Sequence, residues 1–464
     1  MQTNNLILDT DSYKASHWLQ YPPGTTSMFS YLESRGGRYD RTLFFGLQYL
    51  LEQLAKGVTV AEVEEAEAFL KAHGEPFNKE GWMYIAKELG GKIPFRIRAV
   101  PEGTVVPNHN VLMSCEALDP KVFWVVSWFE TMLMRVWYPI TVATQSYHIR
   151  EDIYKYLVRT ADAPDAEILF KLHDFGSRGV SSRESAMIGG AAHLVNFRGS
   201  DTIMGVAMAN EYYKAGMAGF SIPAAEHSSI TSWGQKNEVE AFRNMLKQFA
   251  KPGSLVAVVS DSYSIWNAVS ELWGKQLKDE VIKSGATVII RPDSGKPHEV
   301  VLEVLQRLEK EFGTTTNSKG FKVLNNVRVI QGDGISQDEI KYILDAATNW
   351  GYSATNIAFG MGGALLQQVN RDTQRFAYKC SAIIRDGKVV PVSKDPITDP
   401  MKKSKPGYLE LYQNAEGEFE THVRGQAGLT PVMETVFDNG EITKRYTFDE
   451  VRNNAWTPAL ATAK

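Results

Sequence analysis

The chain of 464 residues contains only two cysteines, Cys115 and Cys380, and they stand far apart. This low content excludes a disulfide scaffold and a zinc site built from cysteine pairs, and it favours a reducing cytoplasm. The chain also has no surplus of positive charge. Its formal net charge is −4, so we expect no general attraction to nucleic acid or to anionic lipid. Any site for an anion must therefore be local.

The chain also lacks a long apolar run that is free of charge. Its most apolar stretch, residues 122–143, carries Glu130 and Arg135 in the middle and Pro139 near the end. We therefore predict a buried amphipathic helix here and no membrane span. The first residues show no basic segment followed by an apolar core, so we expect no secretion signal.

Two common phosphate-binding motifs are absent. No Gly-x-x-x-x-Gly-Lys-Ser/Thr run occurs, which excludes a P-loop. No Gly-x-Gly-x-x-Gly opens a βαβ unit, because the glycine-rich stretch 360–363 has the wrong spacing. Neither a solenoid repeat nor a low-complexity tract is present. The composition, 43% hydrophobic and 22% charged, is that of a globular protein, and the length predicts two or three domains.

A short apolar run that ends in polar residues recurs along the middle of the chain, each time followed by a helix-like segment. Fully apolar short runs are typical of parallel strands buried on both faces. Six such units within about 210 residues favour a barrel over a small open sheet. They occupy residues 167–179, 219–228, 255–262, 287–295, 327–334 and 356–363.

Both flanks of this region have a different pattern. Residues 93–107 alternate like strands around a Pro-Glu-Gly turn. After residue 380, Asp386-Gly387, Glu416-Gly417 and Asn439-Gly440 separate β-rich runs, as hairpin turns do. We therefore predict an α/β fold with two domains. The barrel spans residues 161–380, and a β-rich domain combines an N-terminal α+β region, residues 1–160, with residues 381–464.

The carboxyl ends of the predicted strands hold nearly all of the unusual polar residues, and in a barrel those ends carry the site. Arg178 and Arg291 offer forked donors suited to phosphate. Gly332-Asp333-Gly334 and residues 360–363 let backbone N–H groups approach an anion. Carboxylates for a hydroxyl, an amide or hydrated Mg²⁺ come from Asp201, Asp261, Asp293 and Asp333. The set indicates a phosphate, sugar hydroxyls and a divalent cation.

His227 stands in the stretch PAAEHSSIT, residues 223–231, at the end of one apolar run. On residue type alone, a core histidine that has found its hydrogen bonds is the simpler interpretation. The alternative is a phosphoryl acceptor, which needs a neutral ring nitrogen and a carboxylate on the other N–H. Glu226 is expected to point elsewhere on an extended chain. Asp261, at the next strand end, is therefore the better candidate to hold the ring.

In their order along the chain, these motifs resemble the nicotinate/nicotinamide phosphoribosyltransferase family, and within it the enzymes that use nicotinamide. The similarity extends from about residue 5 to about residue 455. It rests on DTDSYKASHWLQYPPG (9–24), HDFGSRGVSS (173–182), AAHLVNFRGSDT (191–202), SIPAAEHSSIT (221–231), VVSDSY (258–263), IIRPDSG (289–295), IQGDG (330–334) and NIAFGMGG (356–363).

The resemblance implies an irregular α/β barrel of the type II phosphoribosyltransferase kind, with a β-rich domain built from both chain ends. It also implies a cytoplasmic homodimer whose active sites lie at the interface. Such enzymes join nicotinamide to 5-phosphoribosyl-1-pyrophosphate and release nicotinamide mononucleotide and pyrophosphate, in NAD salvage. Mg²⁺ is expected to be held mainly through pyrophosphate, so no protein ligand of the metal is assigned.

The implied reaction needs no general base, because the pyridine nitrogen attacks with a free lone pair. Catalysis then rests on positioning and on stabilisation of the leaving anion. Nicotinate phosphoribosyltransferase is the nearest alternative activity, and a catalytically silent homologue that acts as a binding protein is another. Asp201 separates the first two, because its carboxylate accepts from an amide and repels an acid.

The resemblance also implies roles for the residues at matching positions. Phe175 stacks on one face of the pyridine ring and Tyr13 of the partner subunit on the other. Asp201 accepts from the carboxamide, and Arg178 and Arg291 hold phosphate and the polar group of the ring. The expected catalytic set is His227, Asp261, Asp293 and Arg291. The phosphoribosyl and pyrophosphate set is Arg178, His227, Arg291, Asp293, Gly332, Asp333, Gly362, Gly363 and Arg371, with Arg35, Lys394 and Lys402 of the partner subunit.

ATP hydrolysis is coupled to synthesis in such enzymes through a phosphohistidine, and the match PAAEHS gives that role to His227. Our hypothesis is that ATP and phosphoribosyl pyrophosphate share the cationic pocket, and that phosphorylated His227 tightens substrate binding. The chain departs from the family pattern at Ser177, where animal members have an aromatic residue, and at Met361, within a turn that often starts with serine.

Overall fold

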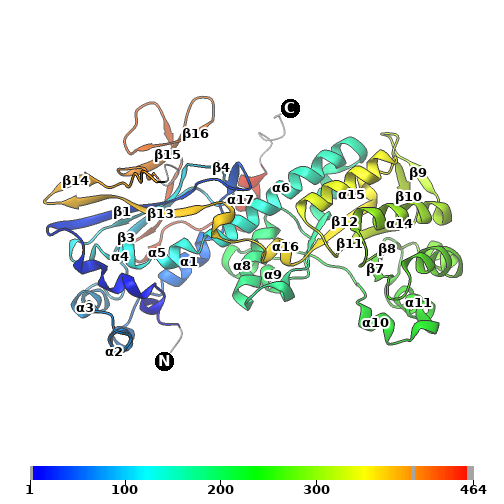
Figure 1. Cartoon of the computed structure of the whole chain (residues 1–464), viewed down its shortest axis with the longest axis horizontal. Helices are drawn as coiled ribbons and strands as arrows, with labels where there is room; N and C mark the ends of the chain where they lie inside the picture. The colour runs from blue at the N-terminus through cyan, green and yellow to red at the C-terminus, as the bar shows by residue number, and fades with distance from the viewer. Residues whose placement is uncertain (1–3, 399–402, 457–464) are drawn as a thin grey trace. The chain divides into compact units, whose positions relative to one another are not determined.

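The computed structural model describes residues 4–398 and 403–456, and it divides the chain into two compact units (Figure 1). The first unit comprises the chain up to residue 144, residues 211–215 and the chain from residue 370 onward. The second comprises residues 145–210 and 216–369. The polar segment 160–166, where the sequence analysis set the domain boundary, follows the end of helix α6 (Trp137–Thr160).

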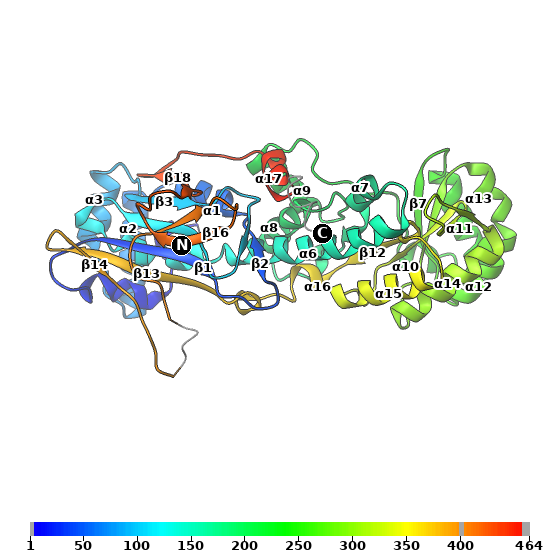
Figure 2. The same ribbon diagram turned by 90° about the horizontal axis from the view of Figure 1, so that it is seen from above.

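The first unit is built around a seven-stranded sheet in the order β14-β13-β1-β5-β3-β18-β19. Strands β14, β13 and β1 run side by side in Figure 2. Its strands come from both chain ends, which confirms the predicted β-rich domain. They are β1 (Thr25–Ser34), β3 (Phe95–Ala99), β5 (Val111–Ala117), β13 (Phe376–Arg385), β14 (Lys388–Pro391), β18 (Glu434–Asp438) and β19 (Glu441–Ile442). Two smaller sheets contain β2 (Arg41–Leu43) with β4 (Val105–Pro107), and β15 (Leu409–Gln413) with β16 (Phe419–Val423) and β17 (Thr430–Pro431).

The three hairpins predicted after residue 380 are confirmed. Asp386-Gly387 joins β13 to β14, Asn439-Gly440 joins β18 to β19, and Glu416-Gly417 lies between β15 and β16. In the first two turns both residues have positive φ, 50° and 73° in one and 48° and 83° in the other. That geometry matches the twist of the flanking strands and favours Asp or Asn followed by Gly.

The prediction of one helix over residues 122–143 is wrong. The stretch is buried, but it is divided among η3 (Pro120–Val122), α4 (Val125–Trp128), α5 (Glu130–Met134) and the start of α6. Large rings redirect the chain, because Trp124 and Trp128 both pack edge-on against Trp82, with ring centroids 5.2 and 5.1 Å away. Pro139 lies in the first turn of α6, where its missing N–H costs no helical hydrogen bond.

The remaining helices of the first unit are α1 (Leu47–Leu54), α2 (Val60–His73), α3 (Lys79–Lys87) and α17 (Phe448–Ala455). Helix α9 (Ile203–Tyr213) ends in this unit. Across residues 4–398 and 403–456, no helix is long and apolar enough to cross a membrane.

The second unit contains a parallel sheet in the order β6-β12-β11-β8-β7. These strands are β6 (Leu172–Asp174), β7 (Leu255–Val259), β8 (Thr287–Arg291), β11 (Val327–Gln331) and β12 (Ile357–Met361). They correspond to five of the six predicted strand units. Their buried residues are mostly Val, Ile and Leu, as is typical of strands covered on both faces.

Short parallel bridges close this sheet into a barrel. Residues 199–200 lie beside β6, through the bridge between Asp174 and Ser200. The segment 220–224 then pairs on both sides: Phe220 bridges to Gly199, and Ala224 bridges to Ala257 of β7. The sixth predicted unit is therefore the segment that closes the ring. The sequence analysis missed the strand at 199–200, because this run is short and polar.

Helices surround the parallel strands, and α14 (Pro297–Phe312) shows why the sequence folds this way. Proline stands at its first position, Gly313 with φ 74° ends it, and Val301, Val304, Leu305, Leu308 and Phe312 form one buried stripe. Each such side chain contributes roughly 1.5–3 kcal/mol through burial. The other helices are α7 (Pro164–Glu167), α8 (Arg183–Leu194), α10 (His227–Thr231), α11 (Glu238–Phe249), α12 (Ile265–Asn267), α13 (Lys278–Ser284), α15 (Gln337–Asn349) and α16 (Gly363–Leu366). A small hairpin, β9 (Thr314–Thr316) and β10 (Lys322–Leu324), lies among them.

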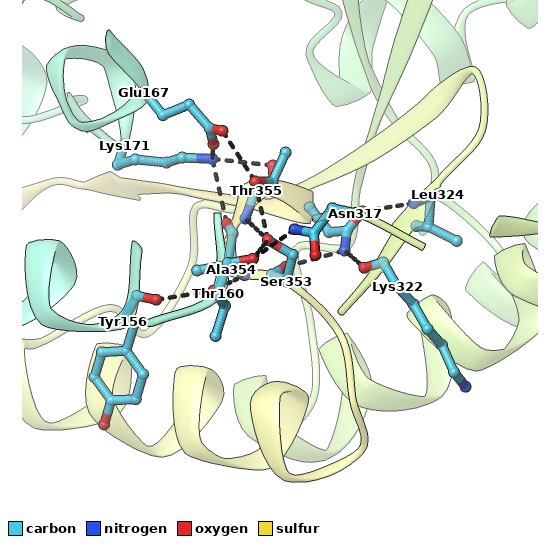
Figure 3. A network of polar contacts seen from close by, with 11 residues as sticks. Tyr156, Thr160, Glu167, Lys171, Asn317, Lys322, Leu324, Ser353, Ala354 and Thr355 are labelled. Atoms are coloured by element: carbon cyan, nitrogen blue, oxygen red, sulfur yellow. Dashed lines mark hydrogen bonds and ion pairs between the residues drawn. The ribbon is translucent and has the colours of Figure 1, made fainter. Parts of the chain in front are cut away.

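A polar network ties the amino ends of β6 and β12 together (Figure 3). Lys171, just before β6, donates to the carbonyls of Ala354 and Thr355, just before β12, over 3.2 and 3.0 Å. Burial lowers the pKa of Lys171 to about 8. Ser353 donates to Thr160 O over 2.7 Å. The contacts at this end fix the strands, which leaves the opposite, carboxyl ends free to carry the site.

Candidate active site

A cavity of about 490 Å³ lies inside the barrel of the second unit. Its lining runs from residues before the strands, such as Lys171 and Asn356, to residues at their carboxyl ends, such as Phe175, Asp201 and Arg291. The volume lies in the range of small-molecule pockets. A flat heterocycle at the carboxyl ends would therefore have its ring against protein and its polar groups near charged side chains.

Phe175 forms one wall of this cavity and is fixed by two glycines. It follows β6 directly, and its N–H donates to Met361 O of β12 over 3.0 Å. A methyl group built at Gly360 would lie 1.9 Å from Cε2 of the ring, and one at Gly332 would lie 3.2 Å from it. Only glycine leaves room for the ring at residue 360. Two neighbouring strand ends thus position the aromatic face that the sequence predicted for the pyridine ring.

Asp201 is placed on the same cavity by the short strand at 199–200. Its backbone N–H donates to Asp174 O over 2.9 Å, and Ser221 Oγ donates to its Oδ1 over 2.5 Å. His173 lies in the same wall, and burial lowers its pKa. A lowered pKa favours the neutral imidazole, so His173 adds no positive charge beside the Asp201 side chain. The sequence analysis did not predict the role of Ser221.

His227 begins helix α10 and does not end a strand, as the sequence suggested. Its Nε2 lies 2.9 Å from Oδ1 of Asp261, which follows β7. The imidazole is 46% exposed, whereas the carboxylate is only 5% exposed. Glu226 instead accepts from Ser228 and caps the helix, so it does not hold the ring. The Asp261 contact is the one expected from the sequence, and it leaves the second ring nitrogen for another partner.

Asp261 also organises the next strand end. Its Oδ2 accepts from the backbone N–H of Asp293 over 3.2 Å and from Ser294 Oγ over 2.6 Å. Arg291, the last residue of β8, has its Nε 3.7 Å from Asp293 Oδ1. Burial raises the pKa of Asp293; the Arg291 guanidinium opposes this shift, and the carboxylates of Asp261 and Asp333 add to it. One connected group of charges therefore spans three strand ends.

Arg178 stands in a loop that lies, in space, beside a second turn that the sequence singled out, residues 360–363. It stands in η5 (Ser177–Gly179), and a methyl group built at Gly179 would lie 3.4 Å from Gly363 Cα. A methyl group at Gly176 would lie 3.0 Å from Gly362 O. The structure thus places the loop after β6 beside the glycine turn after β12. Arg178 is exposed there, and its forked guanidinium donors are suited to an anion.

Three of the four residues assigned to pyrophosphate, Arg35, Arg371 and Lys394, lie in the described part of the first unit. Arg35, Arg371 and Lys394 all act electrostatically on Lys379 of β13, whose pKa is lowered by burial and by these neighbouring cations. The structure therefore gathers three predicted residues around Lys379, which the sequence analysis missed because a lysine within a strand carries no motif. Lys402 lies outside the described residues.

Tyr13 is also in the first unit, in η2 (Ser12–Leu19). Its ring is 57% exposed although it packs edge-on against His17, with centroids 4.8 Å apart. An exposed aromatic side chain held by its own helix is available to a second molecule.

The carboxylates fit an Mg²⁺ ion that is held mostly by substrate. No group of three or more His, Cys, Asp or Glu side chains in the described ranges could by itself hold a metal ion. Asp293 and Asp333 nevertheless lie within electrostatic reach of one another at adjacent strand ends. Mg²⁺ is commonly bound by one or two carboxylates together with substrate phosphates.

Comparison with known families places the chain among pyridine phosphoribosyltransferases. A model of the nicotinate phosphoribosyltransferase (NAPRTase) family matches residues 170–441. A second model, described as the nicotinamide phosphoribosyltransferase N-terminal domain, matches residues 5–97. The two matches together include parts of both units.

Comparison with individual proteins agrees. A relative from Xanthomonas campestris pv. campestris (strain 8004), named nicotinamide phosphoribosyltransferase, is 56% identical over 97% of this chain and 98% of its own length. One of the same name from Mycoplasma pneumoniae is 33% identical over 88% of this chain and 97% of its own length. Two solved structures share the fold: nicotinate-nucleotide pyrophosphorylase from Pyrococcus furiosus (TM-score 0.65, 15% identity, 99% and 97% coverage) and human nicotinic acid phosphoribosyltransferase (0.59, 17%, 96% and 92%).

Proposed function

The chain belongs to the nicotinate phosphoribosyltransferase family, and from that premise we propose that it joins nicotinamide to 5-phosphoribosyl-1-pyrophosphate. The products are nicotinamide mononucleotide and pyrophosphate, so the enzyme is a pentosyltransferase of NAD salvage. The observation that carries the choice of nicotinamide is the Asp201 carboxylate in the wall of the barrel cavity, near Phe175. A carboxylate there accepts from a carboxamide and repels the carboxylate of nicotinate.

The geometry supports a distinct role for each of the residues that line the cavity. Phe175, fixed against Gly332 and Gly360, offers its face to the pyridine ring. Asp201, with one oxygen already bonded to Ser221, keeps its other oxygen for the carboxamide NH₂. Arg291 and Arg178 hold the polar group and phosphate, and Asp293 accepts from the ribose hydroxyls. The ring nitrogen then attacks C1 of the ribose as the C1–O bond to pyrophosphate breaks.

The ribose 5-phosphate would lie at two turns. One contains Gly332 and Asp333, and the other contains Gly362 and Gly363. The leaving pyrophosphate would lie against Arg371, with Arg35, Lys394 and Lys402 of the partner subunit. Within one chain Arg35, Arg371 and Lys394 lie together around Lys379, and several cations close together stabilise a departing polyanion. Bound Mg²⁺ would supply further charge stabilisation, with Asp293 and Asp333 as its protein contacts.

His227 has no task in this transfer, and we assign it to coupling with ATP. If Asp261 accepts from Nε2–H, the lone pair of Nδ1 is free to attack the terminal phosphorus of ATP. The P–O bond to ADP breaks and a P–N bond forms. Water later breaks that bond and releases phosphate. The exposed imidazole and its buried carboxylate support this role.

The proposed active species is a homodimer, since Tyr13 of the partner subunit would cover the second face of the pyridine ring. The exposure of Tyr13 supports this. We place the enzyme in the cytoplasm, where the free thiols of Cys115 and Cys380 stay reduced and both phosphorylated substrates are available.

One assay tests the proposal directly. The purified chain is incubated with phosphoribosyl pyrophosphate, Mg²⁺ and either nicotinamide or nicotinate, and the mononucleotide product is measured. We expect rapid formation of nicotinamide mononucleotide and slow or no formation of the acid product. The reverse preference would identify a nicotinate enzyme, and no product with either base would point to a catalytically silent homologue.

A further inference from the structure

A buried acid lies beside the cations assigned to pyrophosphate. Glu33, near the end of β1, is 1% exposed, and no step of the proposed reaction uses it. Its Oε1 lies 2.9 Å from Arg35 Nε, and its Oε2 forms an ion pair with Lys405 Nζ. Moving a carboxylate out of water is costly, so buried carboxylates are paired. Because two cations share this one carboxylate, its position fixes theirs.

Strand pairing places Glu33 on the same face of the sheet as Lys379. Tyr31 of β1 lies directly opposite Lys379 of β13 in the antiparallel register, and Glu33 stands two residues further along β1. Residues that lie opposite one another, and residues two apart on one strand, point to the same face. Arg35, which pairs with Glu33, also acts electrostatically on Lys379. The buried acid therefore belongs to the cationic cluster around Lys379.

Arg35 keeps one donor that none of the described residues uses. Glu33 accepts from its Nε, whereas its Nη2 is buried and has no hydrogen-bond partner within residues 4–398 and 403–456. A buried donor without a partner calls for an acceptor from outside the chain. A guanidinium that is fixed at one edge and open at the other is prepared for an anion with several oxygens, such as pyrophosphate.

Lys405 connects Glu33 to a second assigned cation, Lys394. The backbone N–H of Lys405 donates to the hydroxyl of Tyr31 over 2.9 Å. The residue before it, Ser404, is 3% exposed and pairs with Lys394. The N–H of Ser404 donates to Lys394 O over 3.1 Å, and its Oγ accepts from the Lys394 N–H over 3.0 Å. Fixing Lys405 therefore also fixes the backbone of Lys394.

We propose that Glu33 is a positioning residue for pyrophosphate, which orients Arg35 directly and Lys394 through Lys405. The inference rests on the proposed function, in which Arg35 and Lys394 serve the active site of the partner subunit. Glu33 itself does not touch substrate. Its negative charge offsets part of the repulsion among the clustered cations, and its ion pairs hold them in one arrangement before the anion binds. Less ordering is then left for pyrophosphate to impose.

The variant Glu33→Gln tests this role in steady-state kinetics. The amide keeps the shape of the side chain but loses the charge, so we expect the KM for phosphoribosyl pyrophosphate to rise on the order of tenfold. The KM for nicotinamide should not change, because Phe175 and Asp201 lie in the other unit. An equal rise in both KM values, or a rise in neither, would overturn the inference.

Glu410→Gln is the matched control for lost stability. Glu410 is as buried as Glu33, lies in the same unit, and also pairs with two cations, Arg98 and Arg424. Both variants lose a buried ion pair, so both should unfold at a lower temperature. Only Glu33→Gln should change the KM for phosphoribosyl pyrophosphate. If Glu410→Gln raises that KM as much, the effect at Glu33 is a loss of stability and the positioning role is wrong.

Pyrophosphate itself gives a measurement that needs no catalysis. Calorimetric titration with pyrophosphate and Mg²⁺ compares the wild type with Glu33→Gln and with Tyr31→Phe, which removes only the hydroxyl that holds Lys405. We expect the Kd to rise on the order of tenfold in Glu33→Gln, and by less in Tyr31→Phe. If Glu33→Gln does not fold, Tyr31→Phe decides, and an unchanged Kd in that variant would overturn the inference.

The inference and the proposed function fail in different ways. If the wild type makes no mononucleotide but binds pyrophosphate, and Glu33→Gln weakens that binding, the proposed function is wrong and the positioning role stands. If the wild type makes nicotinamide mononucleotide while Glu33→Gln keeps a normal KM for phosphoribosyl pyrophosphate and a normal Kd for pyrophosphate, the function stands and the inference is wrong.

Discussion

Asp201 and Ser221 come from neighbouring segments of the barrel, and their short hydrogen bond leaves one carboxylate oxygen for a ligand. We expect Asp201→Asn to lower kcat/KM for nicotinamide and to narrow or reverse the preference over nicotinate. One charge-assisted hydrogen bond contributes roughly 1.5–3 kcal/mol, so the change should be about tenfold to a hundredfold. Both substrates are assayed side by side, with Asp279→Asn, an exposed site on α13, as the control. An unchanged selectivity ratio would show that Asp201 does not select the carboxamide.

His227 allows an equally specific test. In His227→Ala the phosphoryl acceptor is gone, so ATPase activity and the stimulation of synthesis by ATP should vanish. Slow synthesis without ATP should persist, because the transfer itself needs no base. Phosphate release and mononucleotide formation are measured with and without ATP, and circular dichroism checks folding. Full ATP stimulation in the variant would leave His227 as a structural histidine held by Asp261.

At the level of elements, Gly360 of β12 leaves room for the ring of Phe175, which follows β6, so the ends of these two strands depend on each other. In Gly360→Ala the new methyl group would overlap the Phe175 ring, so the ring must move. Overpacking of this kind costs about 1–3 kcal/mol, and here it falls on the wall proposed for the pyridine ring. We expect the KM for nicotinamide to rise on the order of tenfold and the thermal midpoint to fall by several degrees. A normal KM would mean that Phe175 does not form the binding face.

Strand β6 also ends in a buried acid. Asp174 is fully buried, its Oδ1 accepts from Gly176 N–H over 2.7 Å, and burial raises its pKa to about 6 from an ordinary value of 3.8. The folded state favours the protonated acid. The contribution of Asp174 to the stability of the folded protein is therefore complete below pH 3.8, and it is lost as the pH rises through about 6. The side chain of asparagine can still accept from Gly176, and it has no proton to lose.

We therefore expect Asp174→Asn to raise the thermal midpoint relative to the wild type, and to raise it more at pH 7.5 than at pH 5. The difference between the two pH values corresponds to roughly 1–2 kcal/mol. Thermal unfolding of both proteins at each pH gives the result. An equal shift at pH 5 and pH 7.5 would contradict the raised pKa.

The sequence predicted elements with strong local signals. The strands β7, β8, β11 and β12 are short apolar runs, and the hairpin at Asn439-Gly440 has residues that tolerate positive φ. Two features escaped it because tertiary contacts decide them. The polar strand at 199–200 pairs only because β6 lies beside it, and the run 122–143 breaks where its tryptophans pack on Trp82.

The residues of the candidate site also fall into those that the sequence predicted and those that only the structure reveals. Phe175, Asp201, Asp261 and Arg291 stand in recognisable motifs, and the structure brings them to one end of one barrel. Ser221 and Lys379 carry no motif. Their interest comes from neighbours far away in the sequence, such as Asp201 for Ser221, so only the folded chain reveals it.

At the scale of the whole molecule, the first unit exposes apolar side chains that a second chain could cover. Strand β14 is the edge of the seven-stranded sheet, and all four of its residues are exposed, including Val389 and Val390. An exposed edge strand with apolar side chains favours association. Together with the exposed ring of Tyr13, this supports the proposed homodimer.

A homodimer with shared active sites predicts that two inactive variants restore activity when they are mixed, which a monomer cannot do. If each pyridine ring is held by Phe175 and Arg291 of one chain and by Tyr13 of the partner subunit, then Tyr13→Ala and Arg291→Ala damage different halves of each site. Each variant alone should have little activity. A mixed dimer contains one site with both defects and one with neither, so mixing the variants should restore up to about a quarter of the wild-type activity, since half of the dimers are mixed. Subunit exchange is followed with two affinity tags. If the tags show mixed dimers and activity does not return, the two chains do not share their active sites.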